Sequence, residues 1–183
     1  SFSHLSANAA NSDFTIIVYN SSGTEIDRFD SVNGVDSSID FWVNQGQTYT
    51  IWVLGSYSYR EFKYKIKADF SNTSGEYEIQ PNGSLSTAKT IVANTDYQGK
   101  ANANGDNDYY KITVPSGQSS MNVSLTHLTQ NDSTSDFKVK VFRYDGSGNT
   151  PEIHEFTSNN GVNSNYTIGV TANKVYYLNV YGS

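Results

Sequence analysis

The chain has 183 residues, of which 36% are hydrophobic and 14% aromatic, so we expect most of it to be folded, as one large or two small domains. It contains no cysteine, which excludes disulfides and thiolate metal sites, and its net charge of −6 disfavours nucleic-acid binding. No apolar run approaches the roughly 20 residues that span a bilayer, so we expect no membrane insertion.

Short segments rich in β-branched and aromatic residues recur along the chain and predict strands. Clusters of Gly, Asn, Ser and Asp bound them, whereas no apolar pattern of helical period persists for three turns. In chain order, the expected strands are 14–20, 39–44, 48–54, 60–70, 108–114, 121–128, 137–144, 166–170 and 175–181. Many short strands without helices predict an all-β fold of antiparallel sandwiches.

The clearest alternation lies in residues 60–70. Apolar and aromatic residues alternate there with charged ones, so we expect one face in the core and the other in water. The inward set is Phe62, Tyr64, Ile66, Ala68 and Phe70.

The sequence contains an internal duplication. Residues 162–183 repeat residues 35–56 with seven identities, and residues 124–143 repeat residues 1–20 with eight. A repeat of this length indicates duplicated domains, because solenoid repeats run at roughly 20 to 50 residues. Each copy of the stretch 35–56 predicts a β-hairpin, closed in the first copy by the Asn-Gln-Gly-Gln turn.

The duplication predicts two related antiparallel β-sandwich lobes of jelly-roll-like form. We expect the first lobe at 1–71, a linker at 72–83 and the second lobe at 84–183. Compared with each other, the first lobe lacks its leading strands and the second its last strand. Either the chain comes from a longer array, or the lobes share strands. We favour shared or closely packed lobes within a larger multidomain protein, because an unpaired edge promotes aggregation.

Residues 80–114 carry a motif of moderate specificity. Its matching positions are Pro81, Asn82, Ser84 and Ala88, followed by Gly105, Asp106, Asp108, Tyr109, Tyr110 and Lys111. The motif resembles the start of a bacterial pre-peptidase C-terminal (PPC) domain, and the similarity covers 78–183 and, by duplication, 1–70. It departs at Gln80 and Gly83, where that family often has Glu and Asp.

The resemblance implies a small β-sandwich appended to a secreted bacterial enzyme or surface protein, and hence an extracellular or cell-surface location. It also implies that the domain could bind a substrate polymer, as some members do. Some relatives bind calcium near the leading acidic segment.

Two tryptophans are the leading candidates for a binding surface. Strand alternation in the first expected hairpin places Phe41, Val43, Tyr49, Ile51 and Val53 inward. Trp42 and Trp52 then point outward and lie close together if Val43 pairs with Tyr49. Aromatic rings stack on the C–H faces of sugars, so we expect a carbohydrate platform here.

Tyrosines extend this candidate site. The outward positions of the second copy are Gly169, Tyr177, Asn179 and Tyr181. The expected carbohydrate-binding residues are therefore Trp42, Trp52, Tyr57, Tyr59, Tyr177 and Tyr181. The alternative is that the two tryptophans are covered by the other lobe or by residues 57–61 and have a structural role.

A second candidate site is a turn containing Asp106 and Asp108, with Asn102, Asn104 and Asn107 nearby. Oxygen ligands of this kind can bind calcium. The alternative is that these side chains cap backbone amides in the turn. No other cofactor is expected.

Catalysis has little support in the sequence. His4 and His127 occupy equivalent positions, which indicates repeated structural residues, and His154 aligns with Asp27 and is expected to be exposed. Metalloprotease, serine-hydrolase and phosphate-loop motifs are absent. We therefore expect a protein that is not an enzyme.

The sequence as a whole favours a non-catalytic carbohydrate-binding module of a secreted or cell-surface bacterial protein. Polysaccharide is the expected partner, with a lean to starch because a curved α-1,4-glucan could lie in a groove between lobes. The alternatives are a structural or adhesive spacer, or a PPC-type accessory domain of a secreted peptidase.

Overall fold

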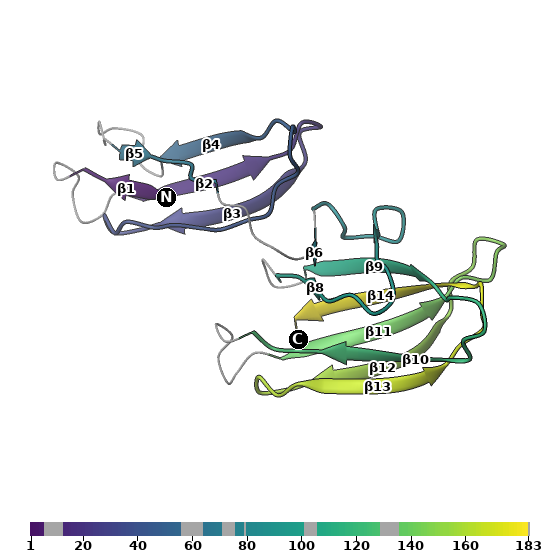
Figure 1. Ribbon diagram of the computed structural model, residues 1–183. Coiled ribbons are helices and arrows are strands. Elements are labelled where there is room, and N and C mark those ends of the chain that lie inside the picture. The colour runs from purple at the N-terminus through teal and green to yellow at the C-terminus, as the bar shows by residue number, and fades with distance from the viewer. Residues whose placement is uncertain are drawn as a thin grey trace. The chain divides into compact units, whose positions relative to one another are not determined.

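The computed structural model describes residues 1–5, 13–55, 64–70, 76–78, 80–100, 106–128 and 136–182. The chain divides into two compact units, unit 1 (Ser1–Ser74) and unit 2 (Gly75–Ser183). The described residues form several antiparallel sheets and no helix, which confirms the all-β sandwich fold (Figure 1). No helix capable of crossing a membrane is found among them.

Unit 1 contains two small sheets. Strands β2 (Phe14–Tyr19), β3 (Glu25–Ser31) and β4 (Thr50–Gly55) form an antiparallel sheet in the order β3-β2-β4. Strand β1 (Phe2–His4) pairs with β5 (Tyr64–Ile66). The core between them contains Phe2, Phe14 and Ile16, with Phe29 and Val53 packed against it.

Unit 2 has a larger sheet in the order β12-β11-β14-β9-β7. Its strands are β7 (Lys89–Thr90), β9 (Asn107–Thr113), β11 (Phe137–Arg143), β12 (Glu152–Ser158) and β14 (Val175–Gly182). All neighbours are antiparallel except β7 and β9.

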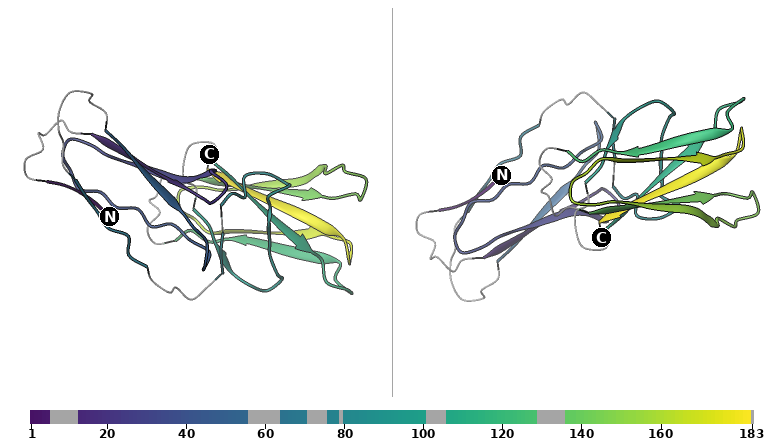
Figure 2. Two further views of the ribbon diagram at one scale, coloured as in Figure 1. Left: turned by 90° about the horizontal axis from the view of Figure 1, so that it is seen from above. Right: turned by 90° about the horizontal axis from the view of Figure 1, so that it is seen from below.

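Two further strand pairs complete unit 2. Strands β10 (Ser120–Leu125) and β13 (Ser164–Gly169) lie side by side as a second sheet (Figures 1 and 2). The short strands β6 (Glu76–Tyr77) and β8 (Tyr97–Gln98) pair in parallel. Both larger sheets contribute to one core, which consists of Ile112, Val114, Val141, Ile168 and Tyr176.

The duplication extends to individual hydrogen bonds. The Nε2 atom of His4 lies 2.7 Å from the Ser31 hydroxyl, and that of His127 lies 2.8 Å from the Ser158 hydroxyl. Each serine hydroxyl in turn donates to a backbone carbonyl, that of Val35 or Val162. Each histidine therefore links a strand of its own unit, β3 or β12, to the segment that contains the histidine, as their equivalent positions predict.

The predicted hairpins at 35–56 and 162–183 do not form. Strand β13 pairs with β10, whereas β14 pairs with β11 and β9, so the chain passes from one sheet to the other. In unit 1, β4 pairs with β2, and Ser37 bridges Phe2.

A tyrosine hydroxyl closes each of these turns. The hydroxyl of Tyr176 accepts the N–H of Thr171 at 3.0 Å, and that of Tyr49 accepts the N–H of Asn44 at 2.9 Å. We call each turn an arch, because in unit 2 it connects two different sheets, whereas in unit 1 the equivalent turn leads into β4 from a stretch without a strand. The alternation of apolar residues is identical in a hairpin and in an arch, so it could not identify the pairing partner.

Two other expectations differ from the structure. In the described part of 60–70, Tyr64, Ile66 and Phe70 are all exposed, because β5 pairs only with the short strand β1. The stretch 72–83, expected as a linker, includes β6 and the buried side chains of Glu78 and Asn82 within unit 2. Residues of such polarity would normally stay in solvent, so their burial indicates a specific polar arrangement.

Candidate functional sites

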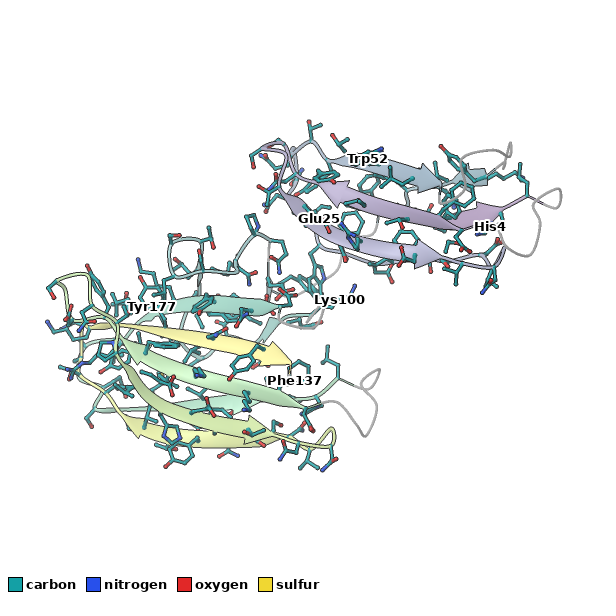
Figure 3. The ribbon with its side chains drawn as sticks, turned by 180° about the vertical axis from the view of Figure 1, so that it is seen from behind. His4, Glu25, Trp52, Lys100, Phe137 and Tyr177 are labelled. Carbon is teal, nitrogen blue, oxygen red and sulfur yellow. The ribbon has the colours of Figure 1, made fainter. Side chains whose placement is uncertain are left out.

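An aromatic surface covers the outer face of the large sheet in unit 2. The residues that alternate with its core positions include Tyr109 on β9, Phe142 on β11, and Tyr177, Asn179 and Tyr181 on β14. In the register of the sheet, Asn179 lies beside Tyr109, and Tyr177 lies beside Phe142. We call these five residues the tyrosine face; Figure 3 shows Tyr177.

The tyrosine face is tightly packed. Tyr109 and Phe142 come from the strands on either side of β14, yet their ring centroids are only 6.4 Å apart. The rings therefore meet above β14 and cover Asn179, whose side chain is 4% exposed. Asn179 donates from Nδ2 to Asn107 Oδ1 at 3.1 Å. This packing holds the aromatic side chains in fixed positions, while each of the four rings remains partly exposed.

Polar and charged groups surround these rings. Lys111, Lys138 and Lys140 alternate with core residues on β9 and β11 and therefore share the outer face. The Nζ atom of Lys140 lies 3.0 Å from Glu152 and 3.3 Å from Glu155. The face thus combines apolar ring surfaces with many hydrogen-bond donors and acceptors.

Unit 1 has a smaller aromatic surface at the equivalent place. Trp52 on β4 is 51% exposed, and its ring centroid lies 6.3 Å from that of Tyr19 on β2 (Figure 3). By the duplication, Trp52 corresponds to Asn179 and Tyr19 to Phe142. The outward direction of Trp52 agrees with the strand alternation, since Val53 packs on the core.

The other predicted aromatic residues are placed differently. Trp42 is half-buried and lies outside any strand, in the stretch equivalent to β13. The pairing that was predicted to bring it beside Trp52 does not form, because β4 pairs with β2. Tyr57 and Tyr59 lie outside the described residues. In the structure, Tyr109 and Phe142 instead lie on the same face as Tyr177. This proximity depends on the register of the sheet, which the sequence alone does not define.

A buried acidic cluster lies elsewhere in unit 2. The carboxyl of Glu78 accepts the Tyr110 hydroxyl at 3.2 Å and the Lys100 N–H at 3.0 Å. Asp108 accepts a hydrogen bond from Gln80 Nε2 at 3.2 Å. Glu78 and Asp108 are both buried, and neither forms an ion pair with any described residue. We call Glu78, Asn82, Asp108 and Tyr110 the acidic cluster.

Burial, and repulsion between the two carboxylates, favour the protonated forms of Glu78 and Asp108 in this cluster. Burial, followed by the charge of Glu78, raises the pKa of Asp108 to about 8. Burial also raises the pKa of Glu78, although the hydrogen bond from the Lys100 N–H opposes this. The Tyr110 hydroxyl is held in its neutral form for the same reasons, with its pKa raised. Two buried carboxyls that cannot both ionise cheaply will retain a proton.

The calcium site predicted at Asp106 and Asp108 fits this arrangement poorly. Asp108 points into the sandwich, where Glu78 and Asn82 are also buried. Both of these residues lie in the stretch 72–83, which was expected to be a linker. No three carboxylate or imidazole groups among the described residues are placed to hold a metal ion together. Calcium takes six to eight oxygen ligands, so the geometry supports a shared proton better. Asn102 and Asn104 lie outside the described residues.

A pocket of about 510 Å³ opens in unit 2 and is lined by Arg143, His154, Tyr166 and Tyr176, among others. His154 stacks on Tyr166 with ring centroids 3.8 Å apart, and its Nε2 atom is buried. His154 was expected to be exposed but is half-buried, because β12 places it on the same face as the core residue Val141.

The comparisons with known proteins add no assignment. No protein-family model matches this chain, and no curated protein matches it significantly. The similarity to PPC domains therefore stays a prediction from the motif residues.

Proposed function

We propose that the chain is a non-catalytic carbohydrate-binding module whose ligand is a polysaccharide. The tyrosine face would be the principal binding surface, and Trp52 with Tyr19 a second one. The observation that supports this most is the gathering of four partly exposed aromatic rings on one outward sheet face. The expected setting is a secreted or cell-surface bacterial protein, as the PPC resemblance implies.

Sugar recognition needs the two kinds of group that this face presents. Aromatic rings supply rigid apolar area at little cost in conformational entropy, and tyrosine adds a hydroxyl. Asn107 and the lysines of the same face supply donors and acceptors for sugar hydroxyls. Because the rings are spread over three adjacent strands, they fit several residues of a polymer better than a single small sugar.

The first test is a titration of the full chain with soluble amylopectin, xylan, β-glucan and mannan. A Trp42→Phe variant leaves Trp52 as the single tryptophan, so a saturable emission change would report binding near unit 1. Isothermal calorimetry of the same mixtures would detect binding at the tyrosine face. The proposal predicts saturable heat with at least one glycan, amylopectin being the first candidate. Silence with all four would contradict it.

A structural or adhesive spacer is the second candidate. It is favoured by the open edge of β4, which has no partner strand among the described residues. A spacer predicts no binding to any glycan in the titration above, and aromatic faces that only pack against other domains.

A further inference from the structure

Strand β4 has one paired and one open edge. It pairs with β2 along its full length, and no strand in the described part of the chain pairs with its other side. Its counterpart in unit 2, β14, is paired with β11 on one side and over seven residues with β9 on the other. The described part of unit 1 therefore lacks the strand that corresponds to β9.

The apolar side chains next to this edge are uncovered. In unit 2, β9 and the residue after it bring Ile112 and Val114 into contact with the core residue Tyr176. In unit 1, Ile51 is 40% exposed and Val43 is 38% exposed. Their counterparts, Leu178 and Val170, are partly buried and pack on the core of unit 2. Among the described residues of unit 1, no strand covers the core at the place that β9 covers in unit 2.

The composition of β4 suits a paired strand. Sheet edges that face solvent normally carry charges or bulges, which prevent pairing with other chains. The edge strand β3 has Glu25, Asp27, Arg28 and Asp30, and β12 has Glu152 and Glu155. Both strands also pair with a register shift. By contrast, β4 has the sequence TIWVLG, with no charge, no proline and no register shift.

We propose that the open edge of β4 is a strand-addition site whose occupant is an extended segment with the sequence pattern of β9. The segment would run antiparallel to β4, as β9 runs to β14. The β9 strand itself is engaged with β14, so the occupant is another segment of the same pattern. By the register of unit 2, an aromatic residue would lie opposite Ile51, as Tyr110 lies opposite Leu178.

A synthetic peptide with the sequence of residues 106–115 tests this directly. The peptide is added to the full chain, and hydrogen exchange of Thr50–Gly55 and tryptophan emission are followed. We expect saturable binding, exchange of the β4 amides slowed by about tenfold or more and, in the Trp42→Phe variant, a blue shift of the Trp52 emission. A peptide carrying Tyr110→Asp and Ile112→Asp, which places charges at the inward positions, is expected to have no effect.

A fusion removes the dependence on peptide affinity. Residues 84–119 are joined ahead of Ser1 by a flexible linker, and the rest of the chain is unchanged. The thermal transition of unit 1, followed by tryptophan emission, is expected to rise. Adding Ile51→Lys is expected to remove the rise. The matched control is Val92→Lys at its exposed site in unit 2, with the fused segment unchanged, and it is expected to keep the rise.

Three results would overturn the proposal. One is unchanged exchange of β4 with the peptide together with an unchanged unit 1 transition in the fusion. Another is equal binding of the peptide that carries the two aspartates. The third is protection of β4 that rises with protein concentration in the absence of peptide, which would identify a second copy of the chain as the occupant. None of these experiments depends on carbohydrate binding.

Discussion

At the scale of single residues, the acidic cluster is the most constrained part of unit 2. Glu78 and Asp108 are buried without an ion pair among the described residues, and the Asn82 side chain beside them is fully buried. The side-chain oxygen and nitrogen of Asn82 have no hydrogen-bond partner in the described part of the chain. Such an arrangement is costly, so small changes in it should change stability measurably.

The pH dependence of unit 2 follows from the raised pKa of Asp108. The folded value is about 8, whereas an aspartate in an unfolded chain has a pKa of about 4. The proton that stabilises the folded state is therefore fully present below pH 4 and lost as the pH rises through 8.

We predict that unit 2 loses stability between pH 5 and 9 in the presence of EDTA, and that Asp108→Asn removes most of this loss. The stability of unit 2 is measured by urea unfolding, with hydrogen exchange of the β9 amides as the probe. Tryptophan emission would not report on unit 2, because both tryptophans lie in unit 1. Stability that rises with pH over this interval would show that the carboxyls are ionised in the folded state. The same measurement with millimolar calcium in place of EDTA shows whether a cation stabilises the ionised form.

Gly99 fits the cluster because it has no side chain. A Cβ at this position would lie 2.6 Å from the Tyr110 hydroxyl and 2.8 Å from Glu78 Oε2. Gly99→Ala should therefore destabilise unit 2 by about 1–3 kcal/mol. Gly169→Ala is the matched control, since nothing lies within 4 Å of its Cβ position. Equal stability of the two variants in urea would contradict the packing described.

At the scale of elements, the arches determine how the two sheets of a unit are connected. In unit 2 the hydroxyl of Tyr176 accepts the Thr171 N–H, and Tyr176 is 1% exposed. In unit 1 the equivalent bond from Asn44 to Tyr49 lies closer to solvent. The same hydrogen bond should therefore have different energetic importance in the two units.

Tyr176→Phe leaves the Thr171 N–H without its acceptor and should cost unit 2 about 1–2 kcal/mol. Tyr49→Phe should cost unit 1 less, because water can replace the hydroxyl there. The two variants are compared by the unfolding of each unit. A larger loss for Tyr49→Phe would contradict the role assigned to the buried arch.

Eight of the expected strands overlap strands of the structure, but the expected strand at 39–44 does not form, and β3 and β12 were not expected. The partners of the strands could not be predicted. The expected strand 108–114 is shifted by one residue from β9, and 137–144 differs from β11 only at its end. Alternation defines the faces of a strand but not its neighbour. The predicted hairpin at 35–56 was therefore wrong, and the proximity of Tyr109 and Phe142 was not predicted. Glu78 and Asn82 were missed because polar residues near a proline have the composition of a linker.

At the scale of the whole molecule, two units of one origin have diverged on the same outer face. Trp52 and Tyr19 in unit 1 correspond to Asn179 and Phe142 in unit 2, while the histidine–serine bridges are the same in both. The internal bonds are shared by both units, whereas the outer residues differ, as the proposed binding function would require of two units that contact a ligand differently. This division supports a binding module more than a uniform spacer.

The most direct test of carbohydrate binding by the tyrosine face is a pull-down on insoluble polysaccharides with three forms of the full chain. These are the unmodified protein, a Tyr177→Ala/Tyr181→Ala variant, and Phe70→Ala, which removes an exposed ring that belongs to neither aromatic surface described above. We predict binding that falls at least tenfold in the double variant and is unchanged in Phe70→Ala, since truncation of an aromatic hot-spot residue typically costs about 2 kcal/mol or more. Equal retention of all three forms, or retention of none, would contradict the assignment of the tyrosine face as a carbohydrate-binding surface.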